Sequence, residues 1–282
     1  MKSKFVYISL SLLCMTLSFC SKDDNYDSNN FATGIVELPA LRSGANDVFI
    51  THSTTFKGQK VTSFSMEYDK SKKHSRWIAF RFDNLTKQQN VDRTDLFDAD
   101  PSLDLEYQRV QADFGKKGYE RGHLCASADR LYSREVNEQT FYYTNMSPQR
   151  RSFNSGIWLD LEGAVRSWGR SCTSSDTLYV VKGGTIDKED QVKEYIGGDR
   201  SKPVPKYYYM ALLFKKGESF KAIAFWVEHT DSGSKSLKPI DCVLSIDELE
   251  EKTGIDFFPS VNDKLENALE ATYSTKAWPG LE

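Results

Sequence analysis

The chain of 282 residues carries little net charge, because its 37 Lys and Arg residues nearly balance 40 Asp and Glu residues, giving a formal charge of −3 at pH 7. Proteins that attract nucleic acid through their overall field are strongly basic, so this balance argues against a high-affinity nucleic-acid binder. An enzyme that turns over its substrate needs only a local basic patch. The hydrophobic fraction of 39% and the charged fraction of 27% are those of an ordinary soluble protein, which excludes a disordered chain and a membrane bundle.

The chain also lacks an apolar run long enough to span a bilayer comfortably. The run that comes nearest, residues 5–19, follows Lys2 and Lys4. A positive start and a short apolar run are typical of a secretory signal. We therefore assign residues 1–20 to a signal peptide, exclude them from the fold and expect an exported protein.

The signal ends at Leu17-Ser18-Phe19-Cys20, which resembles a bacterial lipobox, where the cysteine becomes the lipidated first residue of the mature protein. The resemblance implies lipidation of Cys20, membrane attachment through that lipid alone, and a place in the outer membrane or at the cell surface. Phe19 is bulky for a position that normally takes a small residue. Simple cleavage, which would leave a periplasmic or secreted protein, and an uncleaved anchor therefore stay open. Residues 21–45 are rich in Asp, Asn, Ser and Gly and are expected to form a flexible tether.

Cysteine is scarce beyond the signal, where Cys125, Cys172 and Cys242 are the three thiols of the expected mature domain. An exported location permits disulfides. Three thiols allow three pairings with one left over, and we prefer Cys172 with Cys242, because both precede expected structural elements outside the polar motifs described below. Cys125 is expected to be a small buried side chain rather than a nucleophile.

Residues 46–278 predict one α+β domain, because strand and helix patterns mix without strict alternation and no internal repeat is visible. Residues 90–105 are expected to form a long loop, which would be uncommon unless it served a function. A capping box at Ser245 opens a helix that Gly254 ends. Further helices are expected over 133–140 and 155–171, and strands over 61–68, 76–82, 118–125, 141–144, 177–182, 207–215 and 220–229.

The helix expected over 155–171 has the most regular pattern in the chain. Its apolar residues recur at helical spacing: Ile157, Trp158, Leu161, Ala164, Val165 and Trp168. This spacing places both tryptophans in the core rather than on the surface as base-stacking platforms. Glu162 and Arg166 are four residues apart and therefore neighbours on one flank of the apolar stripe. Asn154 is placed to cap the first turn.

Two stretches of polar residues carry the chemistry: Tyr119-Glu120-Arg121-Gly122-His123-Leu124 and, further along the chain, Asn154-Ser155-Gly156-Ile157-Trp158, followed by Glu162 and Arg166. They resemble the signature of the non-specific DNA/RNA endonucleases of the ββα-metal type, which is Asp-Arg-Gly-His with Asn-x-Gly-x-Trp downstream. The resemblance extends from about Phe64 to Pro259. Glu120 stands where that family usually carries aspartate.

The resemblance implies a single domain with a central antiparallel sheet and a ββα-metal finger as its active site. It implies hydrolysis of DNA and RNA phosphodiesters with one divalent ion, Mg²⁺ or alternatively Mn²⁺ or another divalent cation. Little sequence preference is expected, because the candidate groups address phosphate and metal rather than base edges. Two alternatives stay open. One is a catalytically silent envelope lipoprotein of the same fold that binds nucleic acid or a partner, and the other is a phosphodiesterase that acts on small molecules or lipid head groups.

His123 is the candidate general base. An unperturbed imidazole titrates near pH ~6.5 and can take a proton from water at neutral pH. Among four histidines, His123 alone lies in such a motif, and we expect His52, His74 and His229 to be structural or surface residues.

Asn154 is the candidate metal ligand, because its side chain offers one neutral oxygen to Mg²⁺, which keeps several waters when a protein supplies few ligands. The alternative is that Asn154 only caps its helix, and the resemblance favours the metal. Glu162 would then accept hydrogen bonds from metal-bound water, with a solvent-exposed ion pair to Arg166 as its alternative. Glu120 would orient the site through water from farther out.

Arginine grips phosphate oxygens in bidentate fashion and keeps its charge, so Arg93 and Arg166 are expected to neutralise the phosphate. Arg121 is expected either to touch phosphate or to brace its strand, and Asn145 to contact the substrate or orient the site through hydrogen bonds. Gly122 is expected to allow close backbone packing beside the base. The local basic patch would consist of Lys116, Lys117, Arg121, Arg130, Arg150, Arg151 and Arg166.

Overall fold

The computed structural model describes residues 36–115, 118–197, 200–231, 237–261 and 263–281. The expected signal peptide with Cys20, most of the expected tether, and Lys116 and Lys117 lie outside the described residues. No helix in the part of the chain that is described is long and apolar enough to cross a membrane.

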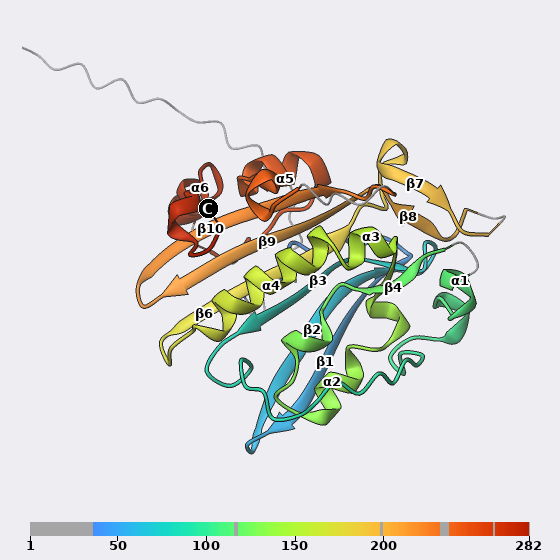
Figure 1. The fold of residues 1–282 in the computed structure, drawn as a ribbon, viewed down its shortest axis with the longest axis horizontal. Helices are drawn as coiled ribbons and strands as arrows, with labels where there is room; N and C mark the ends of the chain where they lie inside the picture. Colours follow the sequence, from blue (N-terminus) through green and yellow to red (C-terminus); the bar gives the residue numbers. More distant parts are fainter. Residues whose placement is uncertain (1–35, 116–117, 198–199, 232–236, 262, 282) are drawn as a thin grey trace, which may run out of the picture.

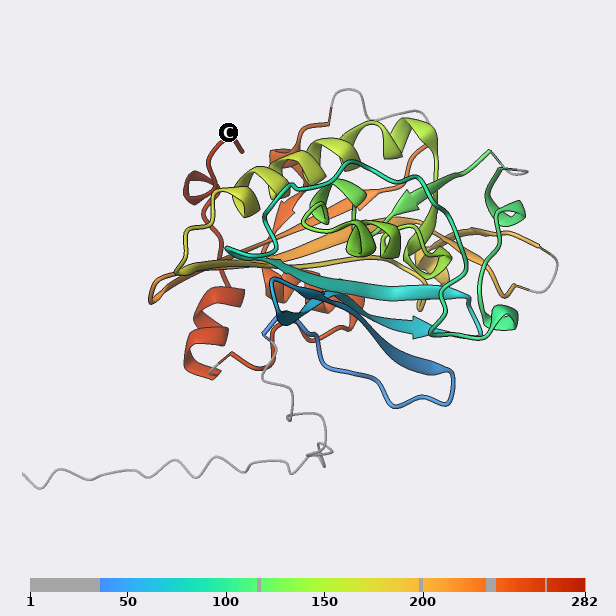
Figure 2. The ribbon, with the colours of Figure 1, turned by 90° about the horizontal axis from the view of Figure 1, so that it is seen from below.

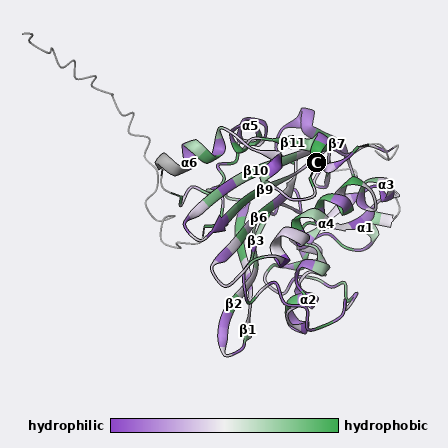
Figure 3. Cartoon of the chain, turned by 60° about the vertical axis from the view of Figure 1, so that its left-hand side comes forward, coloured by the Kyte–Doolittle hydropathy of each residue, from purple (hydrophilic) through white to green (hydrophobic). Residues whose placement is uncertain are grey.

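A central sheet of seven antiparallel strands organises the domain, in the order β1-β2-β3-β6-β9-β10-β11 (Figure 1). The predicted α+β class and the central antiparallel sheet are confirmed. Hydrophilic residues mark the turn that joins β1 to β2 at one edge (Figure 3). The strands are β1 Asp47–Phe56, β2 Gln59–Asp69, β3 His74–Phe82, β6 Asp176–Gly184, β9 Tyr207–Lys216, β10 Ser219–Glu228 and β11 Val243–Leu244.

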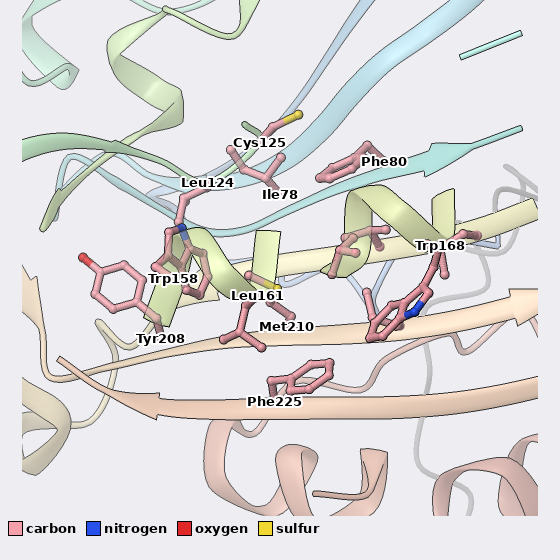
Figure 4. Packing of buried hydrophobic residues seen from close by; sticks show 14 of the residues in the cluster. Ile78, Phe80, Leu124, Cys125, Trp158, Leu161, Trp168, Tyr208, Met210 and Phe225 are labelled. Atoms are coloured by element: carbon pink, nitrogen blue, oxygen red, sulfur yellow. The ribbon is translucent and has the colours of Figure 1, made fainter. Parts of the chain in front are cut away.

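Helices cover both faces of this sheet (Figure 2). Helix α4 (Ile157–Arg170) lies on one face, and α5 (Ile246–Thr253) and α6 (Asp263–Glu270) lie on the other. Because successive strand residues point to opposite faces, Val180 packs in the α4 core and Val181 in the α5 core. Trp158 and Trp168 of α4 are buried against the sheet, as predicted (Figure 4).

A smaller two-stranded sheet forms the ββα finger together with α4. Strand β4 (Glu120–His123) pairs antiparallel with β5 (Met146–Gln149). Ser147 of β5 fixes this finger to the central sheet, because its hydroxyl lies 2.7 Å from His74 Nε2 and 2.7 Å from the Tyr208 hydroxyl. The remaining elements are the helices α1 Ala112–Gly115, α2 Arg134–Gln139 and α3 Arg151–Asn154, a ribbon of β7 Val192–Tyr195 and β8 Pro203–Pro205, and the single turns η2 Leu105–Tyr107, η3 Ser127–Asp129, η4 Tyr143–Asn145, η5 Glu189–Gln191, η6 Pro239–Cys242 and η7 Thr275–Ala277.

Most predicted elements are present, with some differences. The elements that were not predicted are β1, β7, β8, β11, α1, α3 and α6. Residues 141–144 form no strand, because the chain turns through η4 there and pairs only from Met146 onward. The long central helix begins at Ile157 with Gly156 as its N-cap, so the prediction that Asn154 caps it is wrong. Residues 36–45 are not a free tether, since Leu38 packs in the α5 core. The predicted capping box at Ser245 and the left-handed Gly254 (φ 69°) are confirmed.

The predicted long loop lies between β3 and β4 and is anchored by a buried carboxylate. Asp100 Oδ2 lies 2.9 Å from His52 Nε2 and accepts a 2.6 Å hydrogen bond from the Thr144 hydroxyl. These contacts lower the pKa of Asp100 even though its burial alone would raise it. The loop is therefore fixed to β1 and to η4, and it brings Arg93 and Phe97 over the finger.

The three described cysteines are free and buried, so the predicted Cys172–Cys242 disulfide is absent. The Cys172 thiol lies 3.6 Å from the Phe82 carbonyl oxygen, and the Cys242 thiol lies 3.6 Å from that of Lys238. The prediction rested on the positions of the two cysteines along the chain, which say nothing about where their thiols point. Cys125 is a small buried side chain as predicted, and burial raises the pKa of its thiol to about 12.

Candidate active site

Helix α3 and strand β4 bring Asn154 and Glu120 together. Asn154 Nδ2 donates a 2.8 Å hydrogen bond to Glu120 Oε2. A carboxylate only accepts hydrogen bonds, so it holds the amide nitrogen towards itself and leaves Asn154 Oδ1 pointing away. Because Asn154 ends α3 and does not cap α4, this oxygen is not used by a helix terminus. The side chain is arranged as a cation ligand would be.

His123 carries an unpaired nitrogen. Its ring is half-buried at the end of β4, with ring centres 5.0 Å from Phe141 and 5.9 Å from Phe97. Nε2 is inaccessible to solvent and has no hydrogen-bond partner among the described residues. Burial, followed by the positive charges of Arg93 and Arg121, lowers the pKa of His123 to about 3. The imidazole is therefore neutral at physiological pH, and a buried polar atom without a partner is rare in a folded protein.

The other three histidines have hydrogen-bond partners, which agrees with the prediction that they are structural or surface residues. His52 pairs with Asp100, and His74 Nδ1 donates to the Ser75 carbonyl oxygen at 2.6 Å. His229 Nε2 accepts a 2.8 Å hydrogen bond from the Arg150 amide, and its Nδ1 donates to Pro205 at 3.0 Å. Burial lowers the pKa of His229 to about 4, so it too is neutral and holds the start of α3 in place.

An open cavity of about 460 Å³ lies beside β4 and α3. Four predicted residues line it, and two of these are arginines that stack on the rings flanking His123. The Arg121 guanidinium carbon lies 3.5 Å from the ring centre of Phe97, and that of Arg93 lies 4.7 Å from Phe141. The lining residues are Arg93, Asp95, Phe97, Gln111, Phe114, Gly115, Tyr119, Glu120, Arg121 and Asn154. The cavity thus combines positive charge, aromatic faces and the free oxygen of Asn154.

Glu162 and Arg166 are neighbours on α4 as predicted, but they are buried in a charged cluster and not in a solvent-exposed pair. Arg166 Nε donates to Asp129 Oδ1 at 2.9 Å, and Lys182 Nζ donates to Asp129 Oδ2 at 3.2 Å. Glu162 lies 3.8 Å from Lys182 and 3.9 Å from Arg166. The side chains of Asp129 and Lys182 are fully buried.

The cluster leaves Glu162 short of one hydrogen bond. Its Oε1 atom is buried and lacks a hydrogen-bond partner among the described residues. Burial raises the pKa of Glu162 to about 7, partly offset by the Lys182 ammonium. For Asp129 the balance is opposite, because Lys182 and Arg166 lower its pKa despite the burial. Arg166, with a side chain 15% exposed, is held towards Asp129 and does not line the cavity.

Asn145 orients the site but cannot contact a substrate, so that part of its prediction is wrong. The residue is fully buried. Its Oδ1 accepts from the Cys125 amide at 2.8 Å, and its Nδ2 donates to the carbonyl oxygens of Thr140 at 2.6 Å and Cys125 at 2.9 Å. Asn145 therefore fixes the backbone directly after His123.

Two further predictions concern the surroundings of β4. A Cβ atom at Gly122 would lie 2.1 Å from Gln149 Oε1, so the predicted close packing is confirmed. Arg130 is fully buried and lies over Phe80, so it does not belong to the predicted basic patch. Arg150 lies over the ring of Tyr119 beside the cavity.

Sequence reasoning missed Asp129, Lys182, Phe97 and Phe141. The sequence position of Lys182 could have indicated its role, because a lysine that follows the apolar run of a central strand must bury its charge against an acid. Asp129 and the two phenylalanines lie in turns and loops, where spacing predicts no direction for a side chain.

Comparisons with known proteins establish the class. The sequence model of the DNA/RNA non-specific endonuclease family matches residues 44–264. The chain belongs to this family. It is therefore an endonuclease, a hydrolase of phosphodiester bonds.

The chain is similar to several nucleases. It is 28% identical over 218 residues to a nuclease of Nostoc sp., covering 74% of this chain and 75% of that protein. It is 25% identical over 219 residues to the mitochondrial Nuclease EXOG of Mus musculus, covering 72% of this chain and 57% of the mouse protein, and so spans little more than half of that relative. A chain of the solved EndoG/EndoGI complex shares the fold, with a TM-score of 0.64 at 22% identity over 79% of this chain and 90% of that chain.

Proposed function

We propose that this nuclease hydrolyses DNA and RNA at the cavity beside β4 and α3, with His123 as the general base that activates water. One observation carries the proposal: Nε2 of the neutral, half-buried His123 ring has no hydrogen-bond partner among the described residues and lies close to two arginines that line the cavity. A neutral imidazole can accept a proton from water, and the resulting imidazolium is a strong enough acid to release it again.

Arg93 and Arg121 bind the phosphate in this proposal, because both line the cavity and both are held by stacking on a ring. Guanidinium groups neutralise the charge that repels the nucleophile and the charge that develops at phosphorus. Arg166 acts less directly. Its contacts with Asp129 and Glu162 favour a role in positioning Glu162.

Family members typically use a divalent metal ion, and the residues present fit Mg²⁺. Asn154 would hold the ion directly through the oxygen that Glu120 leaves free, while Glu120 and Glu162 would act through water. Mn²⁺ or another divalent cation could bind the same oxygens. A bound ion would stabilise negative charge on the leaving 3′ oxygen. By family resemblance, the products would carry 5′-phosphate ends.

The proposal extends to export. Residues 1–20 would direct secretion, and Cys20 would carry the lipid that anchors the domain in the outer membrane or at the cell surface. Cell fractionation tests this directly. Wild-type chain should partition with membranes, whereas Cys20→Ala should appear in the soluble fraction, and an unchanged distribution would contradict lipidation.

A digestion assay on circular DNA and on single-stranded RNA, with and without EDTA, tests the proposed substrates and cofactor. We expect the mature domain to nick plasmid and degrade RNA with added Mg²⁺ and to lose both activities in EDTA. Cleavage of small phosphodiesters alone would instead support the phosphodiesterase alternative. Activity that persists in EDTA would contradict the metal requirement.

A further inference from the structure

Three carboxylates meet on the α5 side of the sheet, across the sheet from α4. Asp247 and Glu250 come from α5, and Glu270 is the last residue of α6. Each offers an oxygen, and the three oxygens lie within 4.8 Å of one another. Asp256 and Glu266 add two further negative charges to the environment of Glu270. Like charges this close repel unless protons or a cation intervene.

Glu270 makes the cluster more than a group of surface acids. Its side chain is 9% exposed, and its Oε1 atom has no hydrogen-bond partner among the described residues. It also ends α6, where the free carbonyl groups of a helix give a negative potential that disfavours a carboxylate. The last turn of α6 contains no basic residue. Both the burial and the position of this carboxylate disfavour its negative charge unless a positive partner lies beside it.

Glu250 is already oriented for such a partner. Its Oε1 accepts a 2.7 Å hydrogen bond from the Phe257 amide, which fixes the carboxylate and leaves the other oxygen for a ligand. Asp247, one turn earlier on α5, is exposed, so the site is open to solvent on one side.

We propose that Asp247, Glu250 and Glu270 form a Ca²⁺ site that fastens α6 to α5. Oxygen ligands select hard cations, and Ca²⁺ binds six to eight oxygens at about 2.3–2.6 Å in irregular geometry. Ligand oxygens around such an ion lie about 3 to 4.5 Å apart, which agrees with the observed spacing after small side-chain rotations. Mg²⁺ demands a tighter octahedron.

The site would stabilise the end of the domain. Beyond α6 the chain crosses to the other face of the sheet, where Trp278 is buried in the α4 core. There the Pro279 carbonyl oxygen accepts a 2.8 Å hydrogen bond from Trp168 Nε1. A cation that holds α6 in place therefore also holds the segment that packs against α4.

Thermal unfolding of the mature domain with and without Ca²⁺ tests the site. An Asn154→Ala background removes the proposed ligand at the active site, so that any response comes from elsewhere. We expect Ca²⁺ at about 100-fold above its Kd to raise the Tm by about 5 °C or more. Glu270→Gln should abolish this rise without lowering the Tm measured in EDTA, because it also removes a repelled charge.

Glu251→Gln is the matched control, since Glu251 is an exposed acid on α5 outside the cluster, and it should keep the full Ca²⁺ response. Calorimetric titration should give one Ca²⁺ per chain in the Asn154→Ala protein and none after Glu270→Gln. A Tm that does not respond to millimolar Ca²⁺, or a response that Glu270→Gln retains, would overturn the proposal.

Discussion

At the scale of single residues, the site is defined by polar atoms that the fold leaves without partners. His123 Nε2 and Glu162 Oε1 are buried and have no hydrogen-bond partner in the described part of the chain, whereas the other three histidines are hydrogen-bonded. The motif predicted His123 and Asn154 from the sequence. It could not predict that the amide of Asn154 is held by Glu120, because that contact depends on a helix start two residues later than expected.

The contact between Glu120 and Asn154 gives the first prediction. Glu120→Ala removes the group that orients the candidate metal ligand, and losing such an outer partner typically weakens metal affinity about 10- to 100-fold. The Mg²⁺ concentration for half-maximal plasmid nicking should rise accordingly. Glu106→Ala, at an exposed acid in η2, should leave it unchanged. Equal Mg²⁺ dependence in wild type and Glu120→Ala would show that Glu120 does not orient the metal ligand.

The lowered pKa of His123 gives the second prediction. Its ring should remain neutral down to pH 5, which an NMR titration of the ring resonances can follow. In the unfolded chain the same ring takes up a proton near pH ~6.5. The unfolded state therefore binds more protons below that pH, so acidification from about pH 6.5 towards 4 should reduce stability. His123→Asn should show a shallower loss over this window. A ring that titrates near pH 6.5 in the folded domain would contradict the burial argument.

At the scale of elements, periodic patterns predicted most strands and the helix α4, whereas irregular segments could not be predicted. Strand β1 has buried positions at every second residue from Ile50 to Thr54, but two of these positions hold the polar residues His52 and Thr54, which hides its pattern. The aromatic residues of the run 141–144 are typical of a strand. The run is irregular instead, and Phe141 packs against His123. Contacts between elements, such as the cluster that joins α4 to β6, depend on the fold as a whole.

The third prediction concerns this cluster. Lys182→Met leaves the buried carboxylates of Asp129 and Glu162 without the fully buried one of their two shared cations, which should cost about 3–5 kcal/mol of stability. Urea unfolding measures this loss. Lys216→Met, at the exposed end of β9, should change stability little. Adding Asp129→Leu to Lys182→Met should recover part of the loss, and a fully stable Lys182→Met would show that the cluster contributes nothing.

At the scale of the whole molecule, two cores on opposite faces of one sheet hold the domain together, with no disulfide bond among the described residues. The balanced charge of the sequence agrees with an enzyme that relies on a few local positive groups, such as the two arginines that line the cavity. The fold class and the family followed from sequence motifs. The disulfide did not, since thiol geometry is set by packing rather than by order along the chain.

The fourth prediction follows from the free thiols. Because Cys125, Cys172 and Cys242 are unpaired, a reducing agent should not change the Tm of the mature domain. Thiol titration of denatured, unreduced domain lacking residues 1–20 should find three reactive groups. A Tm that falls on reduction, together with only one reactive thiol in the unreduced domain, would show that Cys172 and Cys242 form a disulfide.

The most direct test of the central claim is the cleavage rate of His123→Ala on plasmid DNA with saturating Mg²⁺. The account predicts a loss of at least about 100-fold in kcat, the usual contribution of a general base, with a circular dichroism spectrum like that of wild type. Wild-type activity in a folded His123→Ala protein would contradict it.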